Sequence, residues 1–301
     1  MRVLVLLGLV VAVASNPLTG IRNPQSYHEL VGIPLAKRIK EAEDKLFAGK
    51  DYETVVEQQG RIVGGSVADD NAHPYLAGII INFVNIAGQS ACGSSLISAN
   101  RLVTSAHCWS YGHLQGESLT VVLGSHFLFY GGTRIFTSTV VVHPLWNQSN
   151  LNNDIAVIYL PFDISFTESI QPIALPLDHL TDQFVGQWAT AAGYGFISDE
   201  QTSIDVNTVV SQVDLQVISV DLCQQSFGPQ FVVQSTICTS GAGGVGVCSG
   251  DSGGPLYVTR NGEKILIGVS SFVAAAGCTL GFPSAYARVT SFHHFILEHM
   301  P

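Results

Sequence analysis

The sequence predicts an all-β fold of two small barrels, preceded by a short helical segment. From residue 62 onward, short apolar runs alternate with clusters of Gly, Asn, Ser and Pro, which is typical of strands joined by turns. About 240 residues of this kind fit two small barrels better than one. Hydrophobic residues make up 47% and charged residues only 12% of the 301 residues, so a large core is available and global disorder is excluded.

The first 15 residues are typical of a secretory signal peptide. Arg2 gives the positive start, the stretch from Val3 to Val13 is almost wholly apolar, and small residues follow at Ala14 and Ser15. This stretch is too short to span a bilayer, and no later stretch is long and apolar enough. We therefore expect a secreted protein that makes no use of a membrane.

Residues 16–61 form a segment of different composition, in which we expect a helix from Pro34 to Phe47. Its apolar residues recur at roughly helical spacing, with Lys, Arg and Glu between them. They are Leu35, Ile39, Ala42 and Leu46.

Nine strands are predicted in the remainder, from residue 62 to 301. They are Leu76–Phe83, Leu102–Ser105, Leu119–Leu123, Ile135–Val142, Ile155–Leu160, Val209–Ile218, Pro255–Val258, Ile265–Ser271 and Ala285–Val289. The stretch from Thr290 to His299 is expected to form a terminal helix.

The charge is unevenly distributed along the chain. From Ile62 onward there are five basic and sixteen acidic residues, whereas residues 16–61 carry seven of each sign. So acidic a surface argues against nucleic-acid binding. The small number of basic residues also leaves few cleavage sites for proteases that cut after Lys or Arg.

The six cysteines indicate an oxidising compartment. They are Cys92, Cys108, Cys223, Cys238, Cys248 and Cys278. Six cysteines allow about 15 pairings, so the sequence alone leaves the connectivity open. The lack of Cys-x-x-Cys spacing weakens a zinc or redox interpretation.

A candidate nucleophile lies in the run from Gly250 to Pro255. Ser252 is flanked by glycines that leave its hydroxyl accessible, and the N–H groups of Gly250 and Ser252 are placed to form an oxyanion hole. The Gly-x-Ser-x-Gly pattern also occurs in α/β-hydrolases, and a glycine-rich turn is the alternative interpretation.

A serine nucleophile needs a base and an orienting acid. His107, beside Cys108, is the candidate base, and a bridge from Cys108 to Cys92 would fix its loop. Asp154 enters an apolar strand, where a carboxylate is costly unless it is hydrogen-bonded, and a histidine N–H is a suitable partner. The alternatives are a surface histidine and a solvated turn aspartate.

These residues occur in the order His, Asp, Ser, which differs from that of α/β-hydrolases and subtilisins. Four motifs accompany them: Arg61 to Gly65, Ser105 to Cys108, Asn153 to Ala156, and Gly250 to Pro255. From Ile62 to its end the chain thus resembles a chymotrypsin-like (trypsin-superfamily) serine protease. Its pattern is most similar to insect midgut chymotrypsins and crustacean collagenolytic proteases.

The resemblance implies two antiparallel six-stranded β-barrels packed together with a C-terminal helix. It implies that Ser252 attacks the peptide carbonyl, that His107 transfers the proton and that Asp154 holds His107. It also implies a zymogen that a trypsin-like protease activates by cutting after Arg61, after which the new α-amino group of Ile62 pairs with Asp251.

The resemblance further implies the disulfides Cys92–Cys108, Cys223–Cys238 and Cys248–Cys278. None of them ties residues 16–61 to the peptidase domain, so this prosegment is expected to leave after cleavage. No cysteine-rich clip module is present, which argues against a clotting or immune-cascade role.

The substrate pocket is placed by the same resemblance, with its floor at Gly246 and its walls at Ser271, Phe272, Val273 and Ser284. Gly246 carries no charge, which excludes a trypsin-like preference for Lys or Arg. Val273 is expected to narrow the pocket mouth, and the crustacean enzymes carry an acid where this chain has Ser284. We expect cleavage after apolar or aromatic residues, with elastase-like or collagenolytic specificity as the alternative.

No metal or cofactor is expected, because Ser125 stands where trypsin's first calcium ligand falls. Asn147 opens a glycosylation sequon. The expected protein is a monomeric digestive endopeptidase of the gut lumen, whose partners are protein substrates, its activator and protein protease inhibitors. The competing hypotheses are a non-catalytic homologue that binds partners and an α/β-hydrolase esterase, which chain order and the lack of alternating helices disfavour.

Overall fold

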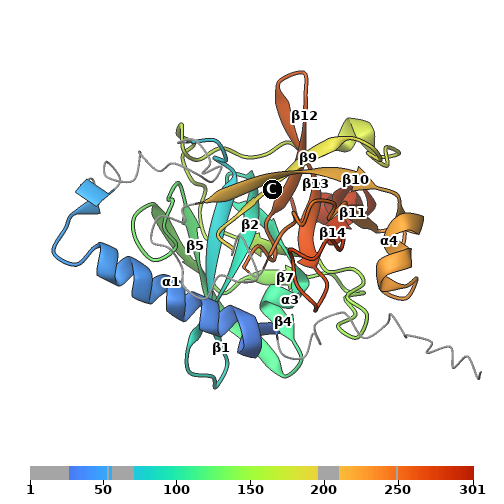
Figure 1. Cartoon of the computed structure of the whole chain (residues 1–301). Helices are drawn as coiled ribbons and strands as arrows, with labels where there is room; N and C mark the ends of the chain where they lie inside the picture. The colour runs from blue at the N-terminus through green and yellow to red at the C-terminus, as the bar shows by residue number, and fades with distance from the viewer. Residues whose placement is uncertain (1–26, 53, 56–70, 196–209, 249) are drawn as a thin grey trace, which may run out of the picture.

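The computed structural model describes residues 27–52, 54–55, 71–195, 210–248 and 250–301. Two curved antiparallel sheets lie side by side, and a long helix near the amino end runs along the outside of the first (Figure 1). The expected signal peptide, Arg61 and Ile62 fall outside the described residues. Among the described residues, no helix has the length and apolar character needed to cross a membrane.

The first sheet contains eight strands. Its hydrogen-bonded order is β4-β5-β1-β2-β3-β8-β7, with β6 pairing on β5. The strands are β1 (Leu76–Phe83), β2 (Gln89–Ser98), β3 (Arg101–Thr104), β4 (Ser110–Tyr111), β5 (Leu114–Leu123), β6 (Thr133–Thr137), β7 (Val140–Val142) and β8 (Ala156–Tyr159). This barrel-like sheet therefore has more than the six strands expected, and its order does not close on itself.

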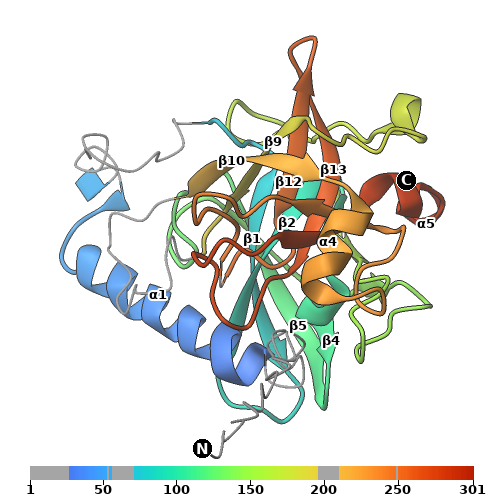
Figure 2. The ribbon, with the colours of Figure 1, turned by 45° about the vertical axis from the view of Figure 1, so that its right-hand side comes forward.

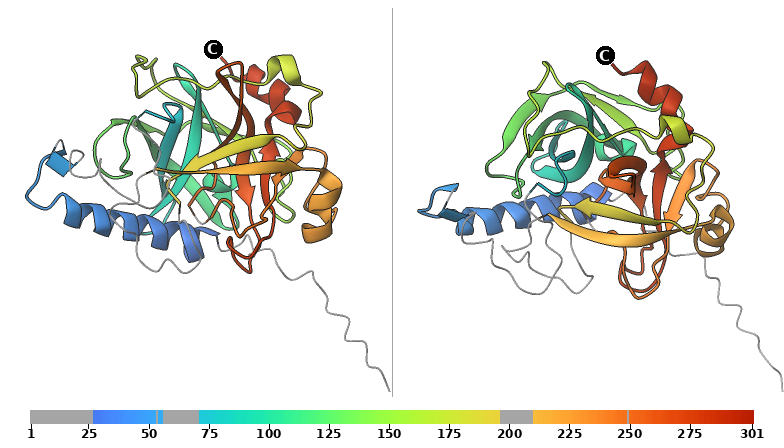
Figure 3. Two further views of the ribbon diagram at one scale, coloured as in Figure 1. Left: turned by 45° about the horizontal axis from the view of Figure 1, so that its top comes forward. Right: turned by 90° about the horizontal axis from the view of Figure 1, so that it is seen from above.

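The second sheet is a closed barrel of six strands in the order β10-β11-β14-β13-β12-β9. The strands are β9 (Trp188–Gly193), β10 (Ser211–Ile218), β11 (Thr236–Thr239), β12 (Pro255–Arg260), β13 (Glu263–Phe272) and β14 (Ser284–Arg288). Figure 3 shows the two sheets from two further directions. The expectation of an all-β fold built from two barrels is confirmed.

Helices lie at both ends of the described chain and between the strands. The amino-terminal pair is η2 (Tyr27–Gly32) and α1 (Ile33–Leu46), which confirms the helix predicted there. The others are α3 (Ala106–Trp109), η3 (Leu177–His179), α4 (Val220–Phe227), η4 (Val289–Phe292) and α5 (His293–Glu298). Helices α1 and α5 lie on opposite sides of the molecule (Figure 2).

The strand prediction missed the two-residue strand β4 and also β2, β9 and β11. The last three are rich in Ala, Gly, Ser and Thr rather than in large apolar residues. In β2 the small residues have a packing reason. A Cβ on Gly93 would lie only 3.0 Å from the Gly254 Cα, so the two chain segments can approach this closely only through glycine. The predicted run Ile135–Val142 divides into β6 and β7, and the Thr137 hydroxyl accepts from the Thr139 N–H at 3.2 Å where they separate.

Strand β1 is apolar on both faces because both faces are covered. Ile79 and Ile81 point into the core of the first sheet. Ile80 points outward and packs, with Ala91, Val122 and Leu128, against Leu35, Ala36 and Ile39 of α1. The buried face of α1 also includes Glu43, whereas Ala42 and Leu46, expected in that stripe, are only half-buried.

Three disulfides join the six cysteines: Cys92–Cys108, Cys223–Cys238 and Cys248–Cys278. These are the pairs that the family resemblance implies. The first ties β2 to α3, and the second ties α4 to β11.

Removing the Cys223–Cys238 bridge should lower stability without disturbing the first sheet. The bridge closes a loop of 15 residues, so the double substitution Cys223→Ala/Cys238→Ala should lower the free energy of unfolding by about 3 kcal/mol. Denaturant unfolding of the full chain measures this. An unchanged unfolding midpoint would show that the bridge adds nothing to the fold.

Candidate active site

The three residues expected to carry the chemistry come from both sheets. His107 lies in α3, directly after β3, and Asp154 lies just before β8. Strands β3 and β8 pair antiparallel, with Thr104 opposite Ala156, which brings the two side chains together. Ser252 precedes β12 of the second sheet.

His107 and Asp154 form a buried pair, 3% and 1% exposed. The His107 Nδ1 lies 2.7 Å from one carboxylate oxygen, and the His107 backbone N–H donates to the other at 2.9 Å. The Ser271 hydroxyl also donates to this carboxylate. Three donors offset the cost of burying the charge. Since a carboxylate only accepts, Nδ1 carries the proton and Nε2 is the free basic nitrogen.

The loop around Ser252 is clamped between the two sheets. The Gly93 N–H of β2 donates to the Ser252 carbonyl at 2.7 Å, and the Gly253 N–H donates to the Ser270 carbonyl of β13 at 2.8 Å. Gly253 has φ +79°, and a Cβ there would lie 2.3 Å from the Gly93 carbonyl oxygen. Gly250 has φ +103°. Both positions therefore require glycine.

Tyr27 stands at the point where the nucleophile and the base should meet. Its ring lies 4.9 Å from the His107 ring, nearly perpendicular to it, and its hydroxyl lies beside the Ser252 side chain. Within the described residues, no hydrogen bond joins the Ser252 hydroxyl to His107. Burial raises the pKa of Tyr27 to about 12, so the phenol is neutral. In the sequence, only its place ahead of an amphipathic helix sets Tyr27 apart, and no motif points to it.

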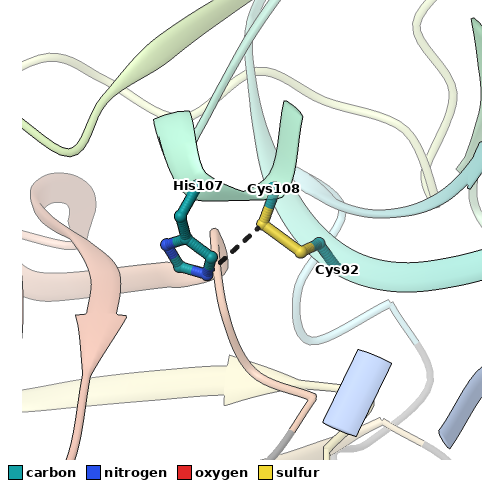
Figure 4. A group of neighbouring side chains, drawn as sticks. All are labelled: Cys92, His107 and Cys108. Atoms are coloured by element: carbon teal, nitrogen blue, oxygen red, sulfur yellow. Dashed lines mark hydrogen bonds between the residues drawn. A yellow bond between two sulfur atoms is a disulfide. The ribbon is translucent and has the colours of Figure 1, made fainter. Parts of the chain in front are cut away.

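The Cys92–Cys108 disulfide lies beside the imidazole, with Cys108 Sγ 3.8 Å from His107 Nε2 (Figure 4). The donor atoms of Cys92, His107 and Cys108 lie within 4.8 Å of one another, a spacing suited to a metal ion. However, the sulfurs are bonded to each other and offer no thiolate ligand. The group therefore positions the histidine loop and does not form a metal site.

Asp251, next to Ser252, is buried and is held by backbone groups. Its carboxylate accepts from the Gly195 N–H at 3.0 Å and from the Cys248 N–H at 2.9 Å. In the described part of the chain it forms no ion pair. Burial raises the pKa of Asp251 to about 6, although the hydrogen bonds from the two backbone donors lower it. An added cation would therefore be stabilised here.

Two of the expected pocket residues face each other directly. A Cβ on Gly246 would lie 2.8 Å from the Ser284 Oγ, so a side chain here would require the Ser284 hydroxyl to move. Ser284 is 2% exposed, and its hydroxyl accepts from the Val247 N–H at 3.3 Å.

The other expected wall residues have different surroundings. Val273 packs against the core of the second barrel, and the Phe272 ring contacts Phe227 of α4 at 5.3 Å between centroids. Ser271 contacts Asp154, as described above. Asn147, the sequon residue, is exposed between β7 and β8, where its side-chain oxygen accepts from the Ser149 N–H at 3.0 Å.

Comparisons with known proteins agree with this geometry. The Trypsin family matches residues 62–296. A collagenase of Hypoderma lineatum is 36% identical over 243 residues, which cover 80% of this chain and 88% of that protein. Brachyurin of Leptuca pugilator is 37% identical over 239 residues, covering 78% of this chain and 96% of that protein. A solved structure of HL collagenase superposes with a TM-score of 0.70 at 34% identity, covering 79% of this chain and 97% of that one.

The chain is a member of the Trypsin family, and residues 62–296 form its family domain. It is a serine endopeptidase with the chymotrypsin-like fold. The segment before residue 62, including Tyr27 and α1, lies outside the family match.

The raised pKa of Asp251 predicts a pH dependence of the uncleaved chain. The folded protein binds the proton more tightly than the unfolded chain, so the stabilising contribution is complete below about pH 4 and is lost as the pH rises through about 6. Relative to Asp251→Asn, the free energy of unfolding of the wild type should fall by up to about 3 kcal/mol over this range. Denaturant unfolding at a series of pH values measures the difference, and parallel curves for the two proteins would contradict the prediction.

Proposed function

We propose that the chain is a secreted zymogen that becomes an active endopeptidase when it is cut after Arg61. The reaction is acyl transfer to Ser252. The observation that carries the proposal is the buried His107–Asp154 pair, in which Nδ1 is bonded to the carboxylate and the basic Nε2 is left for the serine. Secretion is supported by the signal-like residues 1–15 and by the disulfides.

In this mechanism His107 removes the proton of the Ser252 hydroxyl as the oxygen attacks the peptide carbonyl, and it then protonates the leaving amine. Asp154 keeps the imidazole oriented and stabilises its charged form. The N–H groups of Gly250 and Ser252 stabilise the oxyanion. Water then hydrolyses the acyl-enzyme by the same steps in reverse.

Activation would act through Asp251. Cleavage after Arg61 supplies the α-amino group of Ile62, and the buried carboxylate of Asp251 lacks a cation among the described residues. Pairing of the two would stabilise both charges, provided that the geometry is good. Because Asp251 neighbours both Gly250 and Ser252, this pairing would order the oxyanion hole.

The preferred substrates carry an apolar or aromatic residue before the scissile bond. Gly246 and Ser284 provide no charge for Lys or Arg, and Val273 narrows the pocket in this proposal. Collagen-type substrates are a second candidate, supported by relatives named collagenase and brachyurin. A digestive role in a gut lumen would accord with the acidic peptidase domain, which offers few cutting sites to trypsin-like enzymes.

The decisive assay measures hydrolysis of peptides that vary in the residue before the cut. The full chain is cleaved after Arg61 and then freed of its prosegment fragments. We expect turnover with Leu, Met, Phe or Tyr at that position, labelling of Ser252 by a serine-directed phosphonate, and loss of both in Ser252→Ala. Absence of turnover and of labelling would favour the non-catalytic homologue, whereas turnover confined to Lys and Arg would refute the pocket assignment.

Asp154→Asn should lower kcat by about 10⁴-fold, because an amide at this position no longer selects the productive imidazole tautomer. The matched control is Asp178→Asn, which removes a charge from an exposed residue of η3. Steady-state kinetics of the two activated variants measure the effect. A similar kcat in both would show that Asp154 does not orient the base.

A further inference from the structure

The prosegment is docked in the cleft rather than loosely attached. Tyr27 lies against His107 and beside Ser252: its ring is 4.9 Å from the imidazole, and its hydroxyl, next to the Ser252 side chain, donates to the Ala91 carbonyl at 3.5 Å. No acyl group can approach Ser252 while the phenol stays there.

His28 locks this contact through two specific hydrogen bonds. Its Nε2–H donates to the His107 carbonyl at 2.8 Å, which fixes the tautomer, and its Nδ1 accepts from the Ser90 hydroxyl at 2.8 Å. The ring is 1% exposed, and burial beside His107 lowers its pKa to about 3, so it is neutral. Next to it, a Cβ on Gly32 would lie only 2.0 Å from the Ser90 Oγ, so the two chain segments are in close contact.

Helix α1 extends the contact along the outer face of the first sheet, as Figures 1 and 2 show. Leu35 is 2% exposed and packs with Ile80 and Val122 of the sheet. Its side chain also reaches the oxyanion loop, since a Cβ on Gly250 would lie 2.5 Å from a Leu35 methyl carbon. Departure of α1 would expose an apolar patch of the peptidase domain made of Ile80, Ala91, Val122 and Leu128, which favours continued binding.

The loop after β5 provides a third, partly polar contact. The Glu43 carboxylate accepts from the backbone N–H groups of Leu128 and Phe129 at 2.9 and 2.7 Å. The Phe47 ring stacks on Tyr130 at 4.2 Å between centroids. The Tyr130 hydroxyl donates to Asp44 at 2.8 Å. These contacts are specific to the side chains of this segment. They are non-covalent, so they do not require the peptide bond after Arg61 to be intact.

We propose that residues 27–47 are an inhibitor of the active site that binds the peptidase domain non-covalently and remains bound after Arg61 is cut. This rests on the proposed function and refines it, because activation then requires both the cut and the release of the segment. It also replaces the expectation that the prosegment leaves because no disulfide holds it.

The distribution of basic residues gives a route for release. The exposed side of α1 carries Lys37, Arg38, Lys40 and Lys45, whereas the sequence from Ile62 onward has only five basic residues in all. An activating protease that cuts after Lys or Arg therefore destroys the inhibitor while sparing most of the enzyme. Limited cleavage should give a cut but inhibited complex, and exhaustive cleavage should give free enzyme.

The first measurement is binding, which requires no activity. The full chain is cut to completion at Arg61 with a limited amount of immobilised trypsin and passed over a size-exclusion column, and the fractions are analysed by mass spectrometry. We expect the segment containing residues 27–47 to elute with the peptidase domain. Separation from the domain of a segment that mass spectrometry shows to be intact over residues 27–47 would overturn the proposal.

The second measurement is inhibition by a synthetic peptide of residues 27–47 added to exhaustively activated enzyme. We expect competitive inhibition at micromolar concentration, with KM raised and kcat unchanged. Tyr27→Ala and Leu35→Ala in the peptide should each weaken inhibition by about tenfold or more. The matched control is Leu30→Ala, because Leu30 is 71% exposed and its loss should leave inhibition unchanged.

The outcomes separate the two proposals. If the enzyme hydrolyses the substrate panel but the peptide does not inhibit it, the inhibitor proposal is overturned and the proposed function stands. The same conclusion follows if the three substituted peptides inhibit equally. Fully cleaved enzyme, free of the prosegment, that neither hydrolyses substrate nor reacts at Ser252 overturns the proposed function itself.

Discussion

The buried carboxylate of Asp154 is the constraint around which the two sheets are arranged. A charge that is 1% exposed is tolerated only if its oxygens are hydrogen-bonded. Its donors come from different parts of the fold: His107 follows β3 of the first sheet, and Ser271 lies in β13 of the second. Satisfying this one group therefore fixes the imidazole and also ties the two sheets together. The Gly93 and Gly253 hydrogen bonds do the same for the serine loop.

The first sheet has to be considered together with the segment that precedes it. Ile80 and Val122 lie on the outer face of the sheet, where large apolar side chains would be unusual if that face were open to water. Helix α1 covers it, so the consecutive isoleucines of β1 are explained by two buried faces rather than one. The same segment carries Tyr27 to His107 and Ser252, so the packing of α1 and the contact with these two residues belong to one docked segment. In the proposed zymogen, regulation would use the outside of the first sheet as well as the buried Asp251.

The sequence predicted much of the fold for reasons that can be stated residue by residue. The helix from Pro34 to Phe47 and strand β1 were found because their apolar residues repeat at the right spacing. Strands β2 and β9 were missed because close packing, and not side-chain hydrophobicity, selects their small residues. The sequence also predicted that His107 and Asp154 meet, because a buried carboxylate needs a donor such as a histidine N–H. The structure brings them together by pairing the strands that they adjoin.

By itself, the sequence determined the class of the protein, because the motifs around His107, Asp154 and Ser252 are local and their order along the chain is distinctive. It also determined that a separate amphipathic segment precedes the peptidase domain. Only the tertiary structure decided where that segment lies and which residues it contacts. Tyr27 and His28 are ordinary residues in sequence; they contact Ser252 and His107 because α1 docks on a distant sheet face and brings them there. Such long-range contacts leave no local pattern, so composition and spacing cannot reveal them.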